Sequence, residues 1–238
     1  TREDINKALQ QEDPFAFVPT KDEDGHGTFT ASVAAGSANV ENQFVGAAPE
    51  AMIAMVKLKP AKQYLRYYYF IREGALAYQE NDMLAGLYYL NRLALKYDRP
   101  LVLCVPLGGS LGGHNGTAPV CEELEFYAGQ KNRVVVTGTG NEADKRHHYQ
   151  GETSGQKERE MVELRVGPGV RGFQAEIWTD IPDGLAGSLY SPSGEQIQKV
   201  PIRQNSRNEY RFLLEQTTVI IDYRLLVERT NSELIILR

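Results

Sequence analysis

The residue of this chain that is best suited to chemistry is His26, which stands between two glycines, Gly25 and Gly27. Histidine is the side chain best matched to proton transfer near neutral pH. Glycine on both sides removes side-chain bulk, so another chain can approach the imidazole closely. The small and apolar residues 28–36 predict a helix that starts at this histidine. A catalytic histidine is favoured, and a histidine that only caps the following helix is the structural alternative.

A second segment places an amide side chain at the end of a predicted strand. The β-branched residues 134–137 predict a strand that ends in the glycine-rich turn Gly138-Thr139-Gly140. This turn presents one asparagine, Asn141, whose side-chain amide is a hydrogen-bond donor. The segment therefore predicts a donor held at the end of a strand.

Two further motifs follow the same order along the chain. An apolar run ends in Leu107-Gly108-Gly109, and residues 45–49 lead into the apolar residues 52–59. Together with the glycine-flanked histidine and the asparagine turn, these motifs resemble the subtilisin superfamily of serine proteases. The resemblance covers roughly residues 20–150. It is closest to clostridial-type subtilases, including spore-germination proteases, which carry a β-rich jelly-roll insertion before the catalytic serine.

The resemblance implies a role for each of these residues. His26 would be the general base and acid of a serine protease, and Asn141 would donate its amide to the oxyanion of the tetrahedral intermediate. Residues 107–109 and 138–140 would form two walls that hold the substrate, because bare backbone lets a peptide pair as an added strand. The structural alternative is that both segments are only turns at strand ends. The implied partner is a peptide or protein substrate.

Two members of the catalytic triad are not identified in the sequence. The family's aspartate ends a strand ahead of the histidine, and Asp22 and Asp24 are interpreted instead as solvated loop carboxylates. Ser154 is interpreted as part of a linker, because no apolar helix follows it. We therefore expect an internal fragment of a serine endopeptidase, inactive by itself, with the aspartate and the serine outside this chain. The alternatives are an inactive pseudoprotease that binds or signals and a stand-alone α/β binding protein.

Residues 1–150 predict part of a three-layer α/β domain with a parallel sheet. The expected strands are continuously apolar, which is typical of a parallel sheet covered on both faces. The expected helices have apolar residues at helical spacing. The tyrosine-rich residues 63–70 are expected to pack against a neighbouring element, with a substrate-side aromatic surface as the alternative. Strands are expected at residues 52–59, 101–107 and 134–137, and helices at residues 81–97 and 118–131.

The remaining residues predict a different architecture. Residues 151–160 are polar and predict a linker. Residues 161–238 alternate between polar and apolar in short runs separated by turn signals, which predicts part of an antiparallel β-sandwich or jelly roll. Both domains are expected to be incomplete, and their open sheet edges predict self-association. The runs expected to form strands are residues 162–166, 173–178, 185–190, 210–214, 219–227 and 234–237.

The composition limits the partners and cofactors. The net charge of −5 argues against nucleic acid, since phosphate binding needs a basic face. No apolar run approaches the roughly 18 residues that span a membrane. Cys104 and Cys121 lack metal-ligand spacing and are predicted to be reduced, partly buried thiols. His114, His147 and His148 lack the spacing of a zinc site and are interpreted as loop histidines.

We expect no cofactor from these patterns. Calcium is compatible with the family, although no residue pattern indicates a calcium site. No signal peptide opens the chain. The resemblance implies a bacterial protein of the cytoplasm or the spore.

Overall fold

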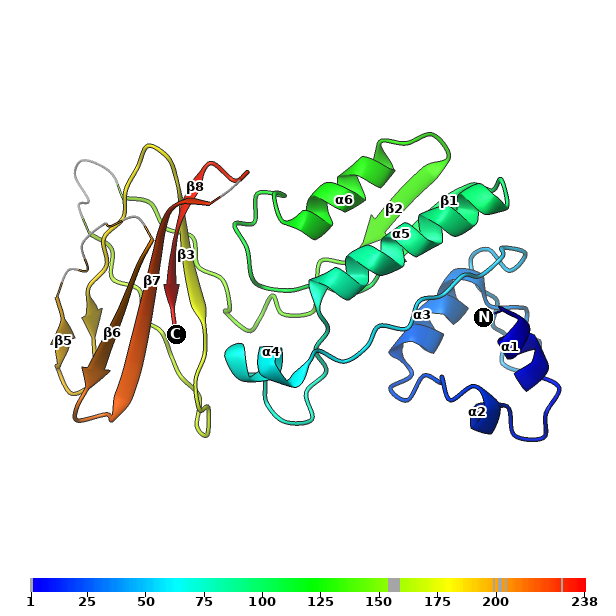
Figure 1. Cartoon of the computed structure of the whole chain (residues 1–238), viewed down its shortest axis with the longest axis horizontal. Helices are drawn as coiled ribbons and strands as arrows, with labels where there is room; N and C mark the ends of the chain where they lie inside the picture. Colours follow the sequence, from blue (N-terminus) through cyan, green and yellow to red (C-terminus); the bar gives the residue numbers. More distant parts are fainter. Residues whose placement is uncertain (1, 154–158, 199, 201–202, 204, 228) are drawn as a thin grey trace. The chain divides into compact units, whose positions relative to one another are not determined.

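The structure is a computed structural model that describes residues 2–153, 159–198, 200, 203, 205–227 and 229–238 (Figure 1). The chain divides into two compact units, Thr1–Leu58 and Lys59–Arg238. The linker expected at residues 151–160 remains a prediction, and residues 154–158 lie outside the described residues. Among the described residues, no helix is both long and apolar enough to cross a membrane.

The helices of the first unit are α1 Arg2–Ala8, α2 Pro14–Phe17 and α3 His26–Ala35. Pro14 occupies the first turn of α2, where its missing N–H is not needed. The Asp13 carboxylate caps this short helix by accepting two of its backbone N–H groups at 3.0 and 3.2 Å. The third helix begins at the predicted histidine, so the structure confirms the helix expected there.

Residues 52–59 form no strand, which corrects the sequence prediction. No described segment pairs with these residues in a ladder. Met52, Ile53 and Met55 are exposed to 67%, 54% and 53%. A strand needs neighbouring strands to satisfy its backbone groups, and the apolar character of a run does not reveal whether such neighbours are present.

The second unit contains a parallel pair of strands, β1 Leu101–Val105 and β2 Arg133–Thr137, covered on one face by two helices (Figure 1). These helices are α5 Glu80–Lys96 and α6 Pro119–Ala128. Leu87 of α5, Leu103 of β1 and Tyr127 of α6 form the buried core between the layers. Burial raises the pKa of the Tyr127 phenol to about 12. This arrangement confirms the predicted parallel α/β character.

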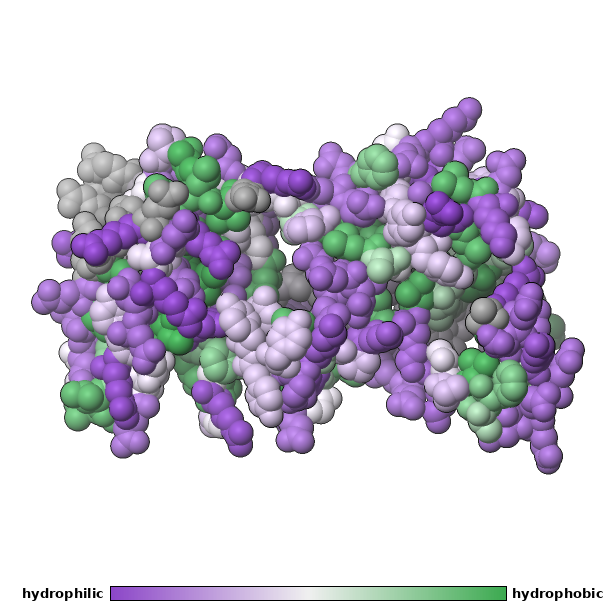
Figure 2. All heavy atoms as spheres, in the orientation of Figure 1, coloured by the Kyte–Doolittle hydropathy of each residue, from purple (hydrophilic) through white to green (hydrophobic). Residues whose placement is uncertain are grey.

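The opposite face of this two-stranded sheet is exposed, which corrects the prediction of strands covered on both faces. Val102, Val134 and Val136 are exposed to 63%, 53% and 49%. Successive side chains of a strand point to opposite faces, and the helices cover only one of them. Cys104 lies on the exposed face, and Cys121 of α6 is exposed too, so the thiols are free but not partly buried. Figure 2 shows small green hydrophobic patches on a mostly hydrophilic surface.

The β-rich part of the second unit has an antiparallel sheet of order β3-β8-β7-β6 and a separate hairpin of β4 and β5. The central strand β8 is buried along its whole length. Apolar side chains of β6, β7 and β8 form the core of this part, together with residues from the β4–β5 hairpin and the segment after it. The strands are β3 Ala175–Asp180, β4 Leu189–Tyr190, β5 Gln196–Ile197, β6 Ser206–Phe212, β7 Thr217–Val227 and β8 Ser232–Leu237.

The antiparallel character of this part confirms the prediction, although the strands differ in detail. Only Leu189–Tyr190 of the run predicted at residues 185–190 forms a strand, and β5 was not predicted. Residues 162–166 are exposed and form no strand. Their polar and apolar residues alternate as in the true strands, but no described strand lies beside them. Period-two alternation therefore identifies segments that can form a sheet without showing which of them find a partner.

The tyrosine-rich segment begins with helix α4 Gln63–Tyr68 and contacts the β-rich part. The Arg238 guanidinium lies 4.1 Å from the centre of the Tyr68 ring, a cation–π contact. A Cβ atom on Gly172 would lie 2.5 Å from the Phe70 ring, so glycine allows this close approach. Packing against a neighbouring element therefore accounts for part of the segment, while Tyr67 is exposed to 74%.

Strand β7 offers a test of the core. Ile221 is 2% exposed, whereas Leu226 on the same strand is 60% exposed. Ile221→Ala should lower the free energy of unfolding by about 2–5 kcal/mol, because it removes buried methyl groups and leaves a cavity. Leu226→Ala is the control and should change it by less than about 0.5 kcal/mol. Urea denaturation followed by circular dichroism measures both, and equal effects would contradict the assigned core.

Candidate functional site

The carboxyl ends of β1 and β2 bring together the two glycine segments expected to bind substrate. In the parallel register Val105 lies opposite Thr137, so both strands end at the same edge of the sheet. Segment 107–109 leaves from the first strand and segment 138–141 from the second, as ligand-binding loops of parallel sheets do. Leu107 is half-buried, and the other residues of both segments are exposed.

Both segments present bare backbone to open space. A Cβ atom on Gly108, Gly109, Gly138 or Gly140 would meet no other atom within 4 Å. Gly140 has a φ angle of 82°, in the left-handed region that favours glycine. Asn141 follows it directly and is exposed. Uncrowded backbone of this kind can pair with an extended peptide.

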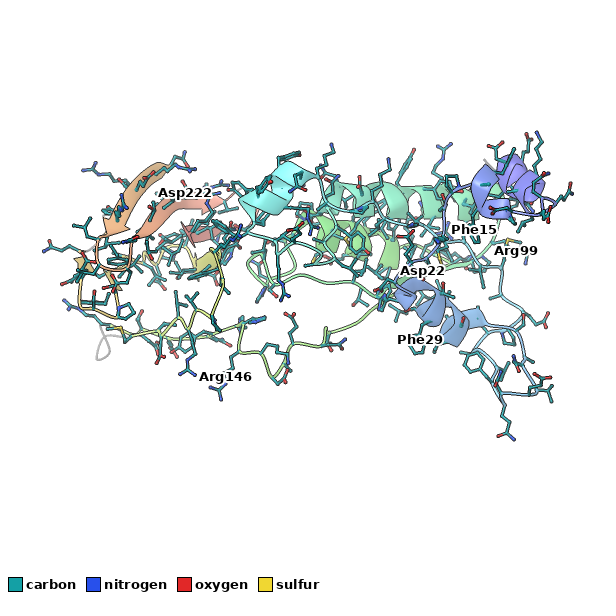
Figure 3. All side chains as sticks on the ribbon, turned by 90° about the horizontal axis from the view of Figure 1, so that it is seen from below. Phe15, Asp22, Phe29, Arg99, Arg146 and Asp222 are labelled. Carbon is teal, nitrogen blue, oxygen red and sulfur yellow. The ribbon has the colours of Figure 1, made fainter. Side chains whose placement is uncertain are left out.

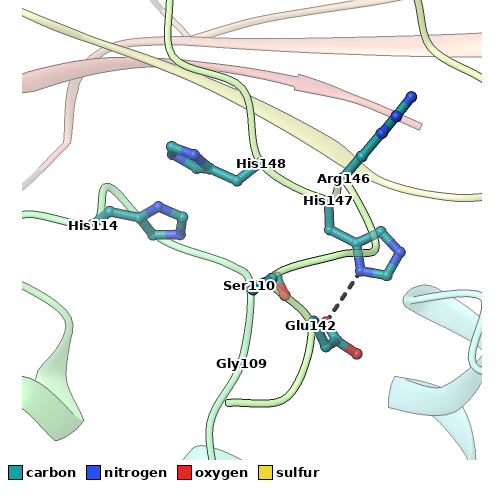
Figure 4. A pocket seen from close by; sticks show the side chains of 8 residues that line it. Gly109, Ser110, His114, Glu142, Arg146, His147 and His148 are labelled. Carbon is teal, nitrogen blue, oxygen red and sulfur yellow. Dashed lines mark hydrogen bonds and ion pairs between the residues drawn. The ribbon is translucent and has the colours of Figure 1, made fainter. Parts of the chain in front are cut away.

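A cavity of about 320 Å³ adjoins these segments and shares a glycine with the first of them (Figure 4). Glu142 Oε2 and His147 Nδ1 lie 3.1 Å apart. The rings of His114 and His148 have centroids 4.9 Å apart, with 30° between their planes. No group of three metal-binding side chains suited to hold an ion occurs in the part of the chain that the structure describes. The cavity is lined by Gly109, Ser110, His114, Glu142, Ala143, Arg146, His147 and His148.

His26 is the first residue of α3 in the first unit, and it is exposed. The Asp22 carboxylate fixes the turn before it (Figure 3). Asp22 Oδ1 accepts from the backbone N–H groups of Asp24 and Gly25 at 3.2 and 2.9 Å. Its Oδ2 accepts from the backbone N–H and the hydroxyl of Thr28, both at 2.8 Å. The bonded residues lie on both sides of His26 in the sequence, Asp24 and Gly25 before it and Thr28 after it. One carboxylate therefore positions the backbone that carries the imidazole.

The same bonds favour the ionised form of this carboxylate. Donation by the Gly25 N–H, followed by the Thr28 N–H and hydroxyl, lowers the pKa of Asp22 well below its usual value of 3.8. A carboxylate whose pKa is lowered on folding stabilises the fold above its unfolded pKa. This contribution is lost as the pH falls from about 4 toward the lower folded pKa.

The other end of α3 is held by segment 45–49. The Gly46 N–H donates to the Gly36 carbonyl at 2.9 Å, and the Ala47 N–H donates to the Val33 carbonyl at 3.0 Å. A Cβ atom on Gly46 would lie 2.3 Å from the Gly36 nitrogen, so only glycine permits this approach. The segment thus secures the helix that carries the candidate histidine.

Comparison with known proteins identifies the family. Residues 2–162, which are more than half of the chain, match the model of the Subtilase family. The chain therefore belongs to the subtilase family. Its fold is similar to the solved structure of the CspB protease of Clostridium perfringens, with a TM-score of 0.70 and 23% sequence identity. The similarity covers 99% of this chain and 47% of that protease, so the chain spans about half of its length. No match is found among curated proteins.

The structure places the predicted site residues in two groups. It brings segments 107–109 and 138–141 together at one sheet edge, whereas His26 lies in the first unit. Ser154 lies outside the described residues. Sequence reasoning missed the role of Asp22, although its spacing to the following N–H groups is the pattern of an aspartate that closes a turn.

Replacing Asp22 should loosen the turn that carries the histidine. In Asp22→Ala the N–H groups of Gly25 and Thr28 lose their acceptor, so their amide hydrogens should exchange several-fold faster at pH 7 in NMR experiments. Asp24→Ala is the matched control, because only the backbone of Asp24 takes part in the network. Equal protection in the two variants would contradict the positioning role.

The wild-type network should also respond to acid. As the pH falls, the amide resonances of Gly25 and Thr28 should titrate together with a midpoint below 3.8, because the pKa of Asp22 is lowered in the folded chain. An NMR pH titration measures this midpoint. A midpoint at or above 3.8 would show that the four hydrogen bonds do not favour the carboxylate.

Proposed function

We propose that this chain is part of a subtilisin-like serine endopeptidase and supplies its general base and its oxyanion donor. The observation that carries the proposal is membership of the subtilase family over residues 2–162, a range that includes both His26 and Asn141. The CspB protease, of which the chain spans about half, supports a longer parent protein with further catalytic residues. The aspartate and the serine of the triad are proposed to come from other parts of the full-length protein.

In the proposed reaction a serine hydroxyl attacks the carbonyl carbon of the peptide bond. His26 takes the hydroxyl proton during attack and returns it to the leaving amine, while an aspartate holds the imidazole in the required tautomer. Asn141 donates its side-chain amide to the oxyanion that forms at the same time. The acyl-enzyme is then hydrolysed by water, with the same histidine acting first as base and then as acid.

The proposed substrate is an extended peptide or a protein segment. Segments 107–109 and 138–140 would pair with the substrate backbone, and the open space beside their glycines supports this role. A pseudoprotease is the alternative, but it would have no chemical reason to keep both a glycine-flanked histidine and a strand-end asparagine. The enzyme is therefore the function that these residues support best.

His26→Ala should abolish peptide hydrolysis by the full-length protein without unfolding it. The loss in kcat should be about 10⁶-fold, as for removal of the base in subtilisin, because no other group would accept the hydroxyl proton. Steady-state kinetics with a cleavable peptide measures the loss, and circular dichroism checks the fold. Glu23→Gln, an exposed neighbour in the same turn, is the control. Near wild-type turnover in His26→Ala would refute the assignment.

Asn141→Ala should be milder and should act on kcat. Loss of one oxyanion donor costs about 10² to 10³ in kcat in subtilisin, with little change in KM, because the donor acts mainly on the transition state. The same kinetic assay separates the two constants. An increase in KM with an unchanged kcat would make Asn141 a ground-state contact and not an oxyanion donor.

A further inference from the structure

A carboxylate of the β-rich part holds the glycine-rich loop that follows β1. Gly112 lies three residues after the end of segment 107–109, and its backbone N–H donates to Glu176 Oε2 at 2.9 Å. Glu176 belongs to β3, an edge strand of the antiparallel sheet, and is 64 positions away in the chain. The bond is partly buried. The loop is therefore tethered close to the segment proposed to pair with the substrate.

Two neighbouring side chains hold this carboxylate in place. The Trp178 indole N–H donates to the same oxygen, Oε2, at 3.0 Å, and the Gln174 amide donates to Oε1 at 2.9 Å. A carboxylate oxygen has two lone-pair sites, so the donors from Gly112 and Trp178 fill those of Oε2. The Trp178 ring also lies against the loop, because a Cβ atom on Gly113 would be 3.3 Å from its Cε3. Glu176 thus presents a fixed acceptor to the loop.

The composition of the loop explains why a tether matters. Residues 108–116 are rich in glycine, the residue that loses the most conformational freedom when a backbone is ordered. Gly112 has a φ angle of 103°, in the left-handed region that favours glycine. A backbone that pairs with a peptide must be ordered, and a backbone that is ordered beforehand binds with less loss of entropy. A fixed point at Gly112 therefore favours peptide binding by segment 107–109.

We propose that Glu176 is a positioning residue through which the β-rich part fixes the peptide-binding segment 107–109. The inference rests on the proposed endopeptidase function, in which this segment pairs with the substrate backbone. Glu176 acts through Gly112 and not by touching the substrate. Backbone pairing is present in the bound substrate and in the transition state alike, so its loss should raise KM and leave kcat unchanged.

Two substitutions of Glu176 separate the acceptor from the charge. Glu176→Ala removes the acceptor. In Glu176→Gln the carbonyl oxygen can still accept from Gly112 and Trp178. Its amide can donate to the Gln174 carbonyl once the Gln174 amide turns over, and this oxygen is buried without a partner among the described residues. Glu176→Gln is therefore the conservative variant that should rescue the tether.

Steady-state kinetics of the full-length protein with a cleavable peptide gives the first measurement. Glu176→Ala should raise KM about three- to tenfold, with kcat within about twofold of wild type, and Glu176→Gln should bring KM back to within about twofold. Arg229→Gln is the matched control, because it breaks a different contact of the β-rich part, the 3.1 Å ion pair with Glu122 of α6. An unchanged KM in Glu176→Ala, or an equal rise in Arg229→Gln, would overturn the proposal.

Hydrogen–deuterium exchange of the same proteins gives a measurement that needs no activity. The amide hydrogens around Gly112 should exchange several-fold faster in Glu176→Ala and as in wild type in Glu176→Gln, while those of the buried strand β8 should not change. If the wild-type protein cleaves no peptide, the endopeptidase function fails, and faster exchange confined to the loop still supports the tether. Unchanged exchange at the loop, or faster exchange in β8 as well, would overturn the positioning role.

Discussion

The parallel pairing of β1 with β2 is the constraint on which the second unit's candidate site depends. Five pairs in register, from Leu101 opposite Arg133 to Val105 opposite Thr137, make both strands end at one edge. A slip of one residue would turn Leu103 out of the core and toward solvent, because side chains alternate between the faces. The core contact of Leu103 with Leu87 and Tyr127 therefore fixes which loops meet at the edge. These loops include the two segments proposed to bind the peptide.

In the first unit, hydrogen bonds at both ends of α3 hold the backbone that carries the exposed His26 imidazole. Asp22 ties the turn before His26 to the first turn of α3, and the contact between Gly36 and Gly46 ties down the end of the helix. Neither device buries the histidine, so its side chain stays accessible. An accessible imidazole on a fixed local backbone is compatible with the proposed role of His26 in proton transfer.

The family and the main elements follow from the sequence because local signals carry them. The periodicity of residues 81–97 and the β-branched run 134–137 each report structure formed by neighbours in the chain, and the structure confirms both. Residues 52–59 and 162–166 fail as strands because pairing depends on distant partners. The cavity beside the two glycine segments could not be predicted, since loops from two different strands must come together to form it.

His26 is proposed to serve as the base for a serine nucleophile of the full-length protein. A fluorophosphonate probe tests it most directly, because the probe labels only an activated serine. Stoichiometric labelling of one serine is expected in the wild-type protein, mapped by mass spectrometry outside residues 1–238, and no labelling is expected in His26→Ala. Labelling that persists in His26→Ala would show that His26 does not activate the serine, and labelling of a serine within residues 1–238 would show that the nucleophile lies in this chain.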